Sequence, residues 1–173
     1  MDLSKLAPSD IVVALRGLER RYQELFEVIE EDESADDLAH RRGADGWAVI
    51  DHVVAAAQAI AAANRALHRV LTGDAPSVQP AEVDPTIRPK PVGPTGSVDE
   101  RLAELGREAT AAAERVERVP AGEWSRQATV ADGSGRTVTA LDIARAAVDA
   151  GVGHLRAARD LLASVRGGRT NPW

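Results

Sequence analysis

The chain has 173 residues, a formal net charge of −6 at pH 7 and no cysteine. The length suits one domain, and the missing cysteine excludes a disulfide scaffold, a thiolate zinc site and a cysteine nucleophile. Alanine accounts for 32 residues, against three tryptophans, one tyrosine and one phenylalanine, which favours closely packed helices over a core of large side chains.

The N-terminal residues MDLSKLAPSD lack the basic and apolar regions of a signal peptide, so we expect a cytoplasmic protein. No uninterrupted apolar stretch is long enough for a membrane span. The negative charge and the absence of a basic stripe also predict no nucleic-acid partner.

Residues 8–31 are predicted to form the first helix. Apolar side chains recur there at alternating steps of four and three, which is the spacing of one face of a packed helix. These side chains belong to Ile11, Leu15, Leu18, Tyr22, Leu25 and Ile29. The acidic residues between 32 and 37 follow. They predict a solvated loop, since a calcium site needs regularly spaced ligands and a glycine turn.

A second helix is predicted over residues 45–72, beginning near Trp47 and ending before Gly73. Its stretch 55–63 is so rich in alanine that neighbouring helices can approach closely. Asn64 falls on the apolar face, where its amide needs a hydrogen-bond partner. Residues 73–97 hold six prolines and predict a long extended crossover.

The third helix is predicted over residues 98–119, with Ser97 as N-cap and Glu100 completing a capping box. Residues 126–138 alternate around the turn sequence DGSG and predict a β-hairpin. The serine of that turn is not a nucleophile elbow, which needs a strand directly before it and a helix directly after it. A fourth helix, capped by Thr139, covers 140–166. The predicted fold class is therefore all-α: a four-helix bundle with a long proline-rich crossover and a short hairpin.

Two segments carry a resemblance to a known family. The second helix contains GWAVIDHVVAAAQ, in which a histidine follows a tryptophan, and the last helix contains a His-Leu-Arg element within TALDIARAAVDAGVGHLRAARDLL. Together with the crossover and the strand-like segment before the last helix, these features resemble the DinB-like superfamily of four-helix bundles. That superfamily includes metal-dependent thiol transferases and mycothiol-dependent maleylpyruvate isomerases. The resemblance implies one DinB-like domain spanning 1–173.

The resemblance also implies a metal site. Members of the family hold a divalent metal with one histidine on the second helix and two histidines, four residues apart, on the fourth. Here His154 matches the second member of the pair, but Ala150 stands at the first and cannot ligate. For the second helix, the spacing from Trp47 points to Ala55 and the Asp-His dipeptide points to His52. We choose His52, because about 100° per residue places it at the edge of the apolar face and Ala55 nearly opposite.

The first hypothesis is a DinB-like protein with a degenerate metal site, which acts as a small-molecule binding or interaction module without turnover. The second is a thiol transferase or hydrolase that uses His52 and His154 around a weakly bound divalent metal, zinc or nickel, with a carboxylate such as Asp51, Asp149 or Glu104 completing the site. Against both stands the ordinary interpretation, in which each histidine is an interfacial residue bonded to a neighbour. The ligand expected under the first two hypotheses is a small molecule or a thiol. A third hypothesis is a purely structural homodimer, because an alanine-rich helix can pack against its symmetry mate as readily as against its own bundle.

Overall fold

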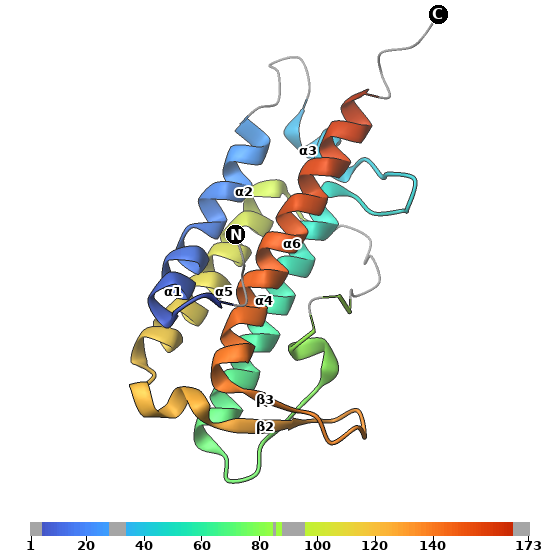
Figure 1. The fold of residues 1–173 in the computed structure, drawn as a ribbon. Helices are drawn as coiled ribbons and strands as arrows, with labels where there is room; N and C mark the ends of the chain where they lie inside the picture. The colour runs from blue at the N-terminus through green and yellow to red at the C-terminus, as the bar shows by residue number, and fades with distance from the viewer. Residues whose placement is uncertain (1–4, 28–33, 85, 88–95, 168–173) are drawn as a thin grey trace, which may run out of the picture.

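The structure is a computed structural model that describes residues 5–27, 34–84, 86–87 and 96–167. Residues 28–31 of the predicted first helix, and the C-terminal Trp173, lie outside the described residues. Four long helical segments run alongside one another, with a small sheet across one end (Figure 1). They are α1 (Pro8–Arg16) with α2 (Leu18–Glu27), α4 (Val49–Thr72), α5 (Val98–Arg118) and α6 (Ala140–Gly167). This confirms the predicted four-helix bundle.

The first predicted helix is divided at Gly17 into α1 and α2. Pro8 occupies the first turn, and the backbone N–H of Ala7 donates to the carboxylate of Asp10. Gly17 keeps φ and ψ of −84° and −6°, and its N–H still bonds to the carbonyl of Val13 over 3.1 Å. The two helices therefore follow one another along the same edge of the bundle (Figure 1).

The predicted acidic loop after the first helix is wrong in part, because residues 35–40 form a short helix, α3 (Ala35–His40). Ser34 caps it, accepting the N–H of Asp37 over 3.4 Å. The helix forms because Leu38 and Ala39 are buried against the bundle, and apolar burial outweighs the acidic character of the rest of the segment.

Helix α4 starts at Val49, four residues later than predicted, and Trp47 precedes it. In its first half nearly every residue is buried, because α4 packs on both α5 and α6. The prediction of a single apolar face with Ala55 on the opposite side was therefore wrong: Ala55 and His52 are both buried. Most alanines of α4 are buried between α4 and its neighbouring helices, where their small side chains allow close helix packing.

Helices α5 and α6 begin at the predicted N-caps. The N–H of Ser97 donates to Glu100, and the N–H of Glu100 donates to the Ser97 hydroxyl. Thr139 caps α6 by accepting the N–H of Asp142 over 3.1 Å. Local side-chain chemistry is sufficient for these boundaries.

The predicted hairpin consists of β2 (Gln127–Val130) and β3 (Thr137–Thr139). Their turn is polar as expected: Asp132 accepts hydrogen bonds from the backbone and hydroxyl of Ser134, which hold the pKa of that carboxyl below its usual value. The described part of the crossover contains secondary structure that was not predicted. It contributes β1 (Ser77–Val78), which pairs parallel to β2, and a 3₁₀ turn, η2 (Pro80–Glu82). A second 3₁₀ turn, η3 (Ala121–Ser125), joins α5 to β2.

The core is built from aliphatic side chains and alanine, with Tyr22 as its largest fully buried side chain. Phe26 lies at the edge of the core, and the half-buried Trp124 packs against the core. None of the described helices has the length and hydropathy of a membrane span.

Candidate functional site

His52 and His154, the two histidines singled out in the sequence, lie against one another inside the bundle. His52 stands in the first turns of α4 and His154 in the second half of α6, 102 residues later. Their Nδ1 atoms are 3.2 Å apart, at hydrogen-bond distance. Only 2% of His52 and 5% of His154 is exposed. The two imidazoles therefore form one buried polar unit.

Trp47 covers this histidine pair. Its ring stacks on His52 at a centroid distance of 4.7 Å and an interplanar angle of 18°, and it lies 6.2 Å from the ring of His154. Trp47 is itself half-buried, just before α4. A backbone bond holds it there, since its N–H donates to the carboxylate of Asp45 over 3.0 Å.

Asp51, the residue next to His52, is also buried but serves the backbone. Its carboxylate accepts the N–H of Ala48 over 2.9 Å and lies 3.4 Å from the guanidinium of Arg42. A carboxylate in the first turn of a helix satisfies an otherwise unpaired N–H and complements the helix dipole. Asp51 is thus engaged at the start of α4 and not directed at the two imidazoles.

Ala150 stands one turn before His154 and lines a void of about 20 Å³ together with it. That volume is enough for about one water molecule. The crossover also contributes to the lining of this void, through residues that include Asp84 and Ile87, which the sequence did not connect with this site. Hydrogen bonds from Thr86 to Asp84 hold the pKa of that carboxyl below its usual value. The Asp84 carboxylate is therefore already bonded within its own loop.

His52 and His154 meet only part of what a metal centre requires. Two nitrogens each bonded to one ion at about 2.1 Å lie about 3.4 Å apart in tetrahedral geometry, so the His52–His154 distance suits a shared ion. A protein zinc site takes at least three protein ligands. Throughout the described ranges, no three histidine, cysteine, aspartate or glutamate side chains are grouped to hold a metal. The residues present therefore do not fit a three-ligand centre.

The remaining candidates lie apart from the histidine pair. Glu104 is paired with Arg101 over 2.7 Å on α5, and Asp149 is half-buried on α6, five residues before His154. His40 bonds through Nδ1 to the backbone of Asp36. His68 is exposed on α4. Of the predicted ligands, the structure brings together only His52 and His154.

Comparison with known proteins finds a similar fold in a solved structure. No family model matches the chain, and no curated protein matches it. Among solved structures, it is similar to YfiT from Bacillus subtilis, described as a probable metal-dependent hydrolase with an unusual four-helix bundle topology. The TM-score is 0.70 at 14% sequence identity, and the match covers 93% of this chain and 87% of that one. At this identity the similarity shows a common fold.

Proposed function

We propose that this chain, which has the fold of the DinB-like four-helix bundles, carries a metal centre reduced to a histidine pair. In this proposal it acts as a small-molecule binding or interaction module without catalytic turnover. The observation that carries the proposal is the 3.2 Å contact between His52 and His154, with Ala150 at the position where the resemblance implies a third ligand.

The hydrogen-bond distance between the two imidazoles supports this proposal. At hydrogen-bond distance, one neutral imidazole donates from Nδ1 and the other accepts at Nδ1. A metal ion bound at these two atoms would need both lone pairs and would displace the shared proton. The contact therefore competes with metal binding. Asp51, the nearest carboxylate in the sequence, offers no compensation because it holds the N–H of Ala48.

A divalent-metal-dependent thiol transferase or hydrolase using His52 and His154 is the second candidate. One observation favours it: the Nδ1 atoms are at a distance that a shared zinc or nickel ion can span. YfiT, whose fold is similar, is described as a probable metal-dependent hydrolase. With only two protein ligands, the second candidate requires a weakly bound metal.

Calorimetric titration with zinc and nickel separates the two candidates. The proposal predicts negligible and equal binding by the wild type and by His154→Ala, and binding that appears in Ala150→His, where residues four apart share one face of α6. Ala146→His is the matched control, since it adds a histidine to the same void one turn further away. Wild-type binding that is lost in His154→Ala would instead favour the metal-dependent enzyme.

The homodimer stays a prediction, and sedimentation at micromolar concentration tests it. This prediction rests on the alanine-rich second helix, and in the structure most of the alanines of that helix are buried within the chain. A monomer in sedimentation would contradict the prediction of a homodimer and would not affect the proposal about the histidine pair.

A further inference from the structure

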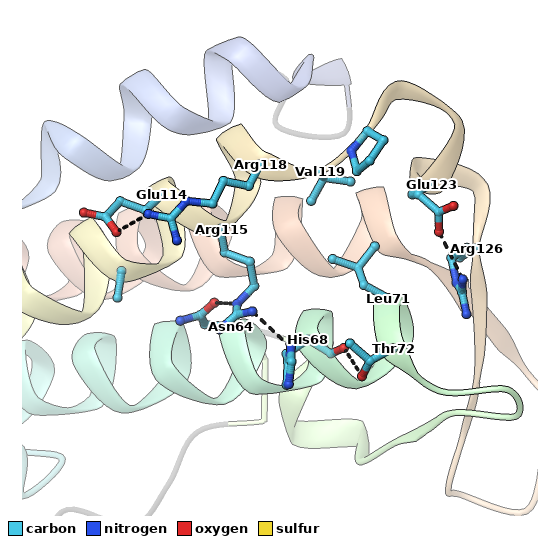
Figure 2. Close-up of a pocket in the computed structure, with 12 residues that line it drawn as sticks. Asn64, His68, Leu71, Thr72, Glu114, Arg115, Arg118, Val119, Glu123 and Arg126 are labelled. Carbon is cyan, nitrogen blue, oxygen red and sulfur yellow. Dashed lines mark hydrogen bonds and ion pairs between the residues drawn. The ribbon is translucent and has the colours of Figure 1, made fainter.

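A second, larger cavity lies between the C-terminal halves of α4 and α5 and is closed at one end by η3 (Figure 2). Its volume is about 580 Å³, within the usual range of small-molecule sites. His68 at its wall follows His52 by 16 residues along α4, about 24 Å at 1.5 Å per residue. The cavity is therefore distinct from the histidine pair.

Arg115 projects from α5 into the middle of this cavity (Figure 2). Its Nε donates to the Asn64 side-chain oxygen over 2.6 Å, and its Nη1 lies 3.1 Å from Nδ1 of His68. A guanidinium only donates, so His68 accepts at Nδ1 and carries its proton on Nε2. Both partners are neutral and sit on α4, so they orient the half-buried Arg115 without cancelling its charge.

The other two arginines of the cavity are already neutralised. Arg118 pairs with Glu114, and Arg126 pairs with Glu123, each over 3.1 Å. Within the described part of the chain, Arg115 has no carboxylate at ion-pair distance. Three arginines and two glutamates leave the lining with one net positive charge, on a chain whose own net charge is −6. That positive charge is located on Arg115.

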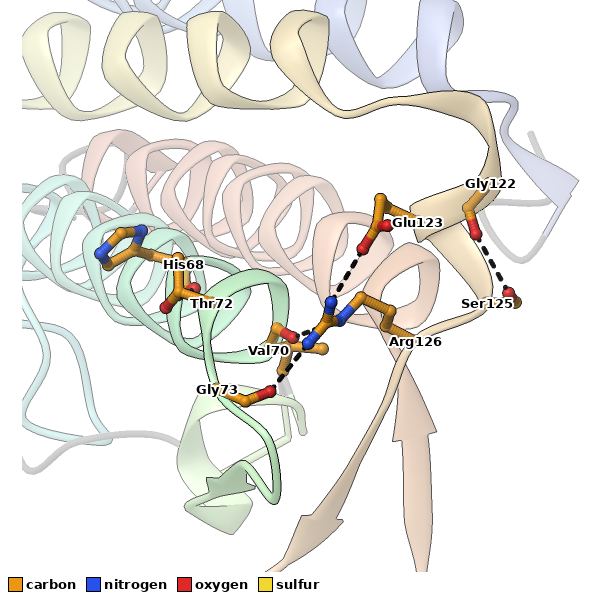
Figure 3. A network of polar contacts seen from close by, with 8 residues as sticks. All are labelled: His68, Val70, Thr72, Gly73, Gly122, Glu123, Ser125 and Arg126. Carbon is orange, nitrogen blue, oxygen red and sulfur yellow. Dashed lines mark hydrogen bonds and ion pairs between the residues drawn. The ribbon is translucent and has the colours of Figure 1, made fainter.

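Arg126, which also lines the cavity, is held by hydrogen bonds to the end of α4 (Figure 3). Its Nε donates to the carbonyl of Val70 over 3.0 Å and its Nη2 to the carbonyl of Gly73 over 2.8 Å. These carbonyls lie at the end of α4, where they lack partners within the helix. Arg126 thus ties the segment after η3 to the end of α4.

We propose that this cavity binds a monocarboxylic acid with an apolar body, the carboxylate on Arg115 and the body along the apolar lining. Three of the five N–H donors of Arg115 make no hydrogen bond within the described residues, and a guanidinium matches a carboxylate in a bidentate pair. The apolar lining consists of Leu71, Ala111, Val119 and Pro120. A single negative charge fits best, because it matches the one net positive charge of the lining.

Calorimetric titration of the wild type with octanoate and with its uncharged amide tests the charge requirement directly. We expect octanoate to bind with a Kd of about 1 mM or tighter, and octanamide to bind at least about tenfold more weakly, since it cannot form the charged bidentate pair. Equal binding of acid and amide, or no binding of octanoate up to about 10 mM, would overturn the proposal.

Two variants locate the site. Arg115→Gln should weaken octanoate binding at least about tenfold, and Ala111→Phe should block the cavity without changing its charge. Arg20→Gln, which removes an exposed arginine on α2 that pairs with Glu24, should leave binding unchanged. Wild-type affinity in both cavity variants would contradict the proposal. The comparison of acid with amide needs no variant, so the test holds even if a variant fails to fold. Its outcome is also independent of the metal titrations.

Discussion

The hydroxyl of Tyr22 on α2 donates a hydrogen bond of 2.9 Å to the carbonyl oxygen of Gly151 on α6. Tyr22 is fully buried, and Gly151 lies within α6, where the missing side chain lets α2 approach. The bond joins two helices that are far apart in the sequence, and it gives the buried hydroxyl its partner, as a buried polar group requires.

Tyr22→Phe should lower the free energy of unfolding by about 1 kcal/mol, the usual net value of a buried hydrogen bond whose acceptor keeps another partner. The aromatic ring and its packing stay in place. Urea denaturation followed by circular dichroism measures the change. An unchanged midpoint would show that the bond contributes nothing to stability.

Tyr22 is the only tyrosine, so its ionisation can be followed alone. Burial raises the pKa of its hydroxyl far above the ordinary value of 10.0. The folded chain therefore retains the proton that the unfolded chain releases, and the associated stability is complete below pH 10 and is lost as pH rises beyond it. We expect the phenolate absorbance to appear together with loss of helical circular dichroism. Phenolate appearing near pH 10 in a fully helical protein would contradict this.

Gly151→Ala should destabilise the bundle by about 1–3 kcal/mol through overpacking. A methyl group there would lie 2.7 Å from a methyl carbon of Leu18 and 3.4 Å from one of Ile60. Gly153→Ala, two residues further along α6, is the matched control because nothing lies within 4 Å of the added carbon. We expect the control to stabilise by about 0.5–1 kcal/mol, since alanine favours a helix interior. Thermal unfolding of both variants should give shifts of opposite sign.

Asp51→Ala should cost about 1–2 kcal/mol, because it leaves the buried N–H of Ala48 without its acceptor. Asp51→Asn keeps a side-chain oxygen and should cost less. The exposed Asp99, in the first turn of α5, provides the control: Asp99→Ala removes a charge near a helix start at a cost of about 0.5 kcal/mol. An equal loss of unfolding free energy in Asp51→Ala and Asp99→Ala would show that the hydrogen bond from Ala48 to Asp51 adds no stability of its own.

The helix boundaries set by local chemistry could be read from the sequence. The capping box of Ser97 and Glu100, and the cap at Thr139, act within three residues, so their effect does not depend on the rest of the fold. In contrast, β1 is two residues long and exists because β2 lies beside it. A strand that short has no periodicity of its own to detect.

The residues of the candidate site could be predicted from the sequence, but their arrangement in space could not. The resemblance named His52 and His154, yet a contact spanning 102 residues cannot be read from helical periodicity. The angular argument assumed that the second helix has one buried face, and it fails because α4 packs on two neighbours. The cavity around Arg115 had no sequence signal beyond Asn64, whose predicted need for a partner is met by Arg115 itself.

The parallel pairing of Ser77 with Thr129 closes the chain between them into a loop that contains α5. The pairing of β1 with β2 that closes this loop lies in the small sheet, at the end of the bundle where α4 ends (Figure 1). Residues more than fifty positions apart meet in this pairing, and such non-local contacts form more slowly than local ones such as the β2–β3 hairpin. We therefore expect β1 to pair with β2 late in folding, and protection of the Thr129 N–H, which donates to the carbonyl of Pro76, would report that the loop has closed.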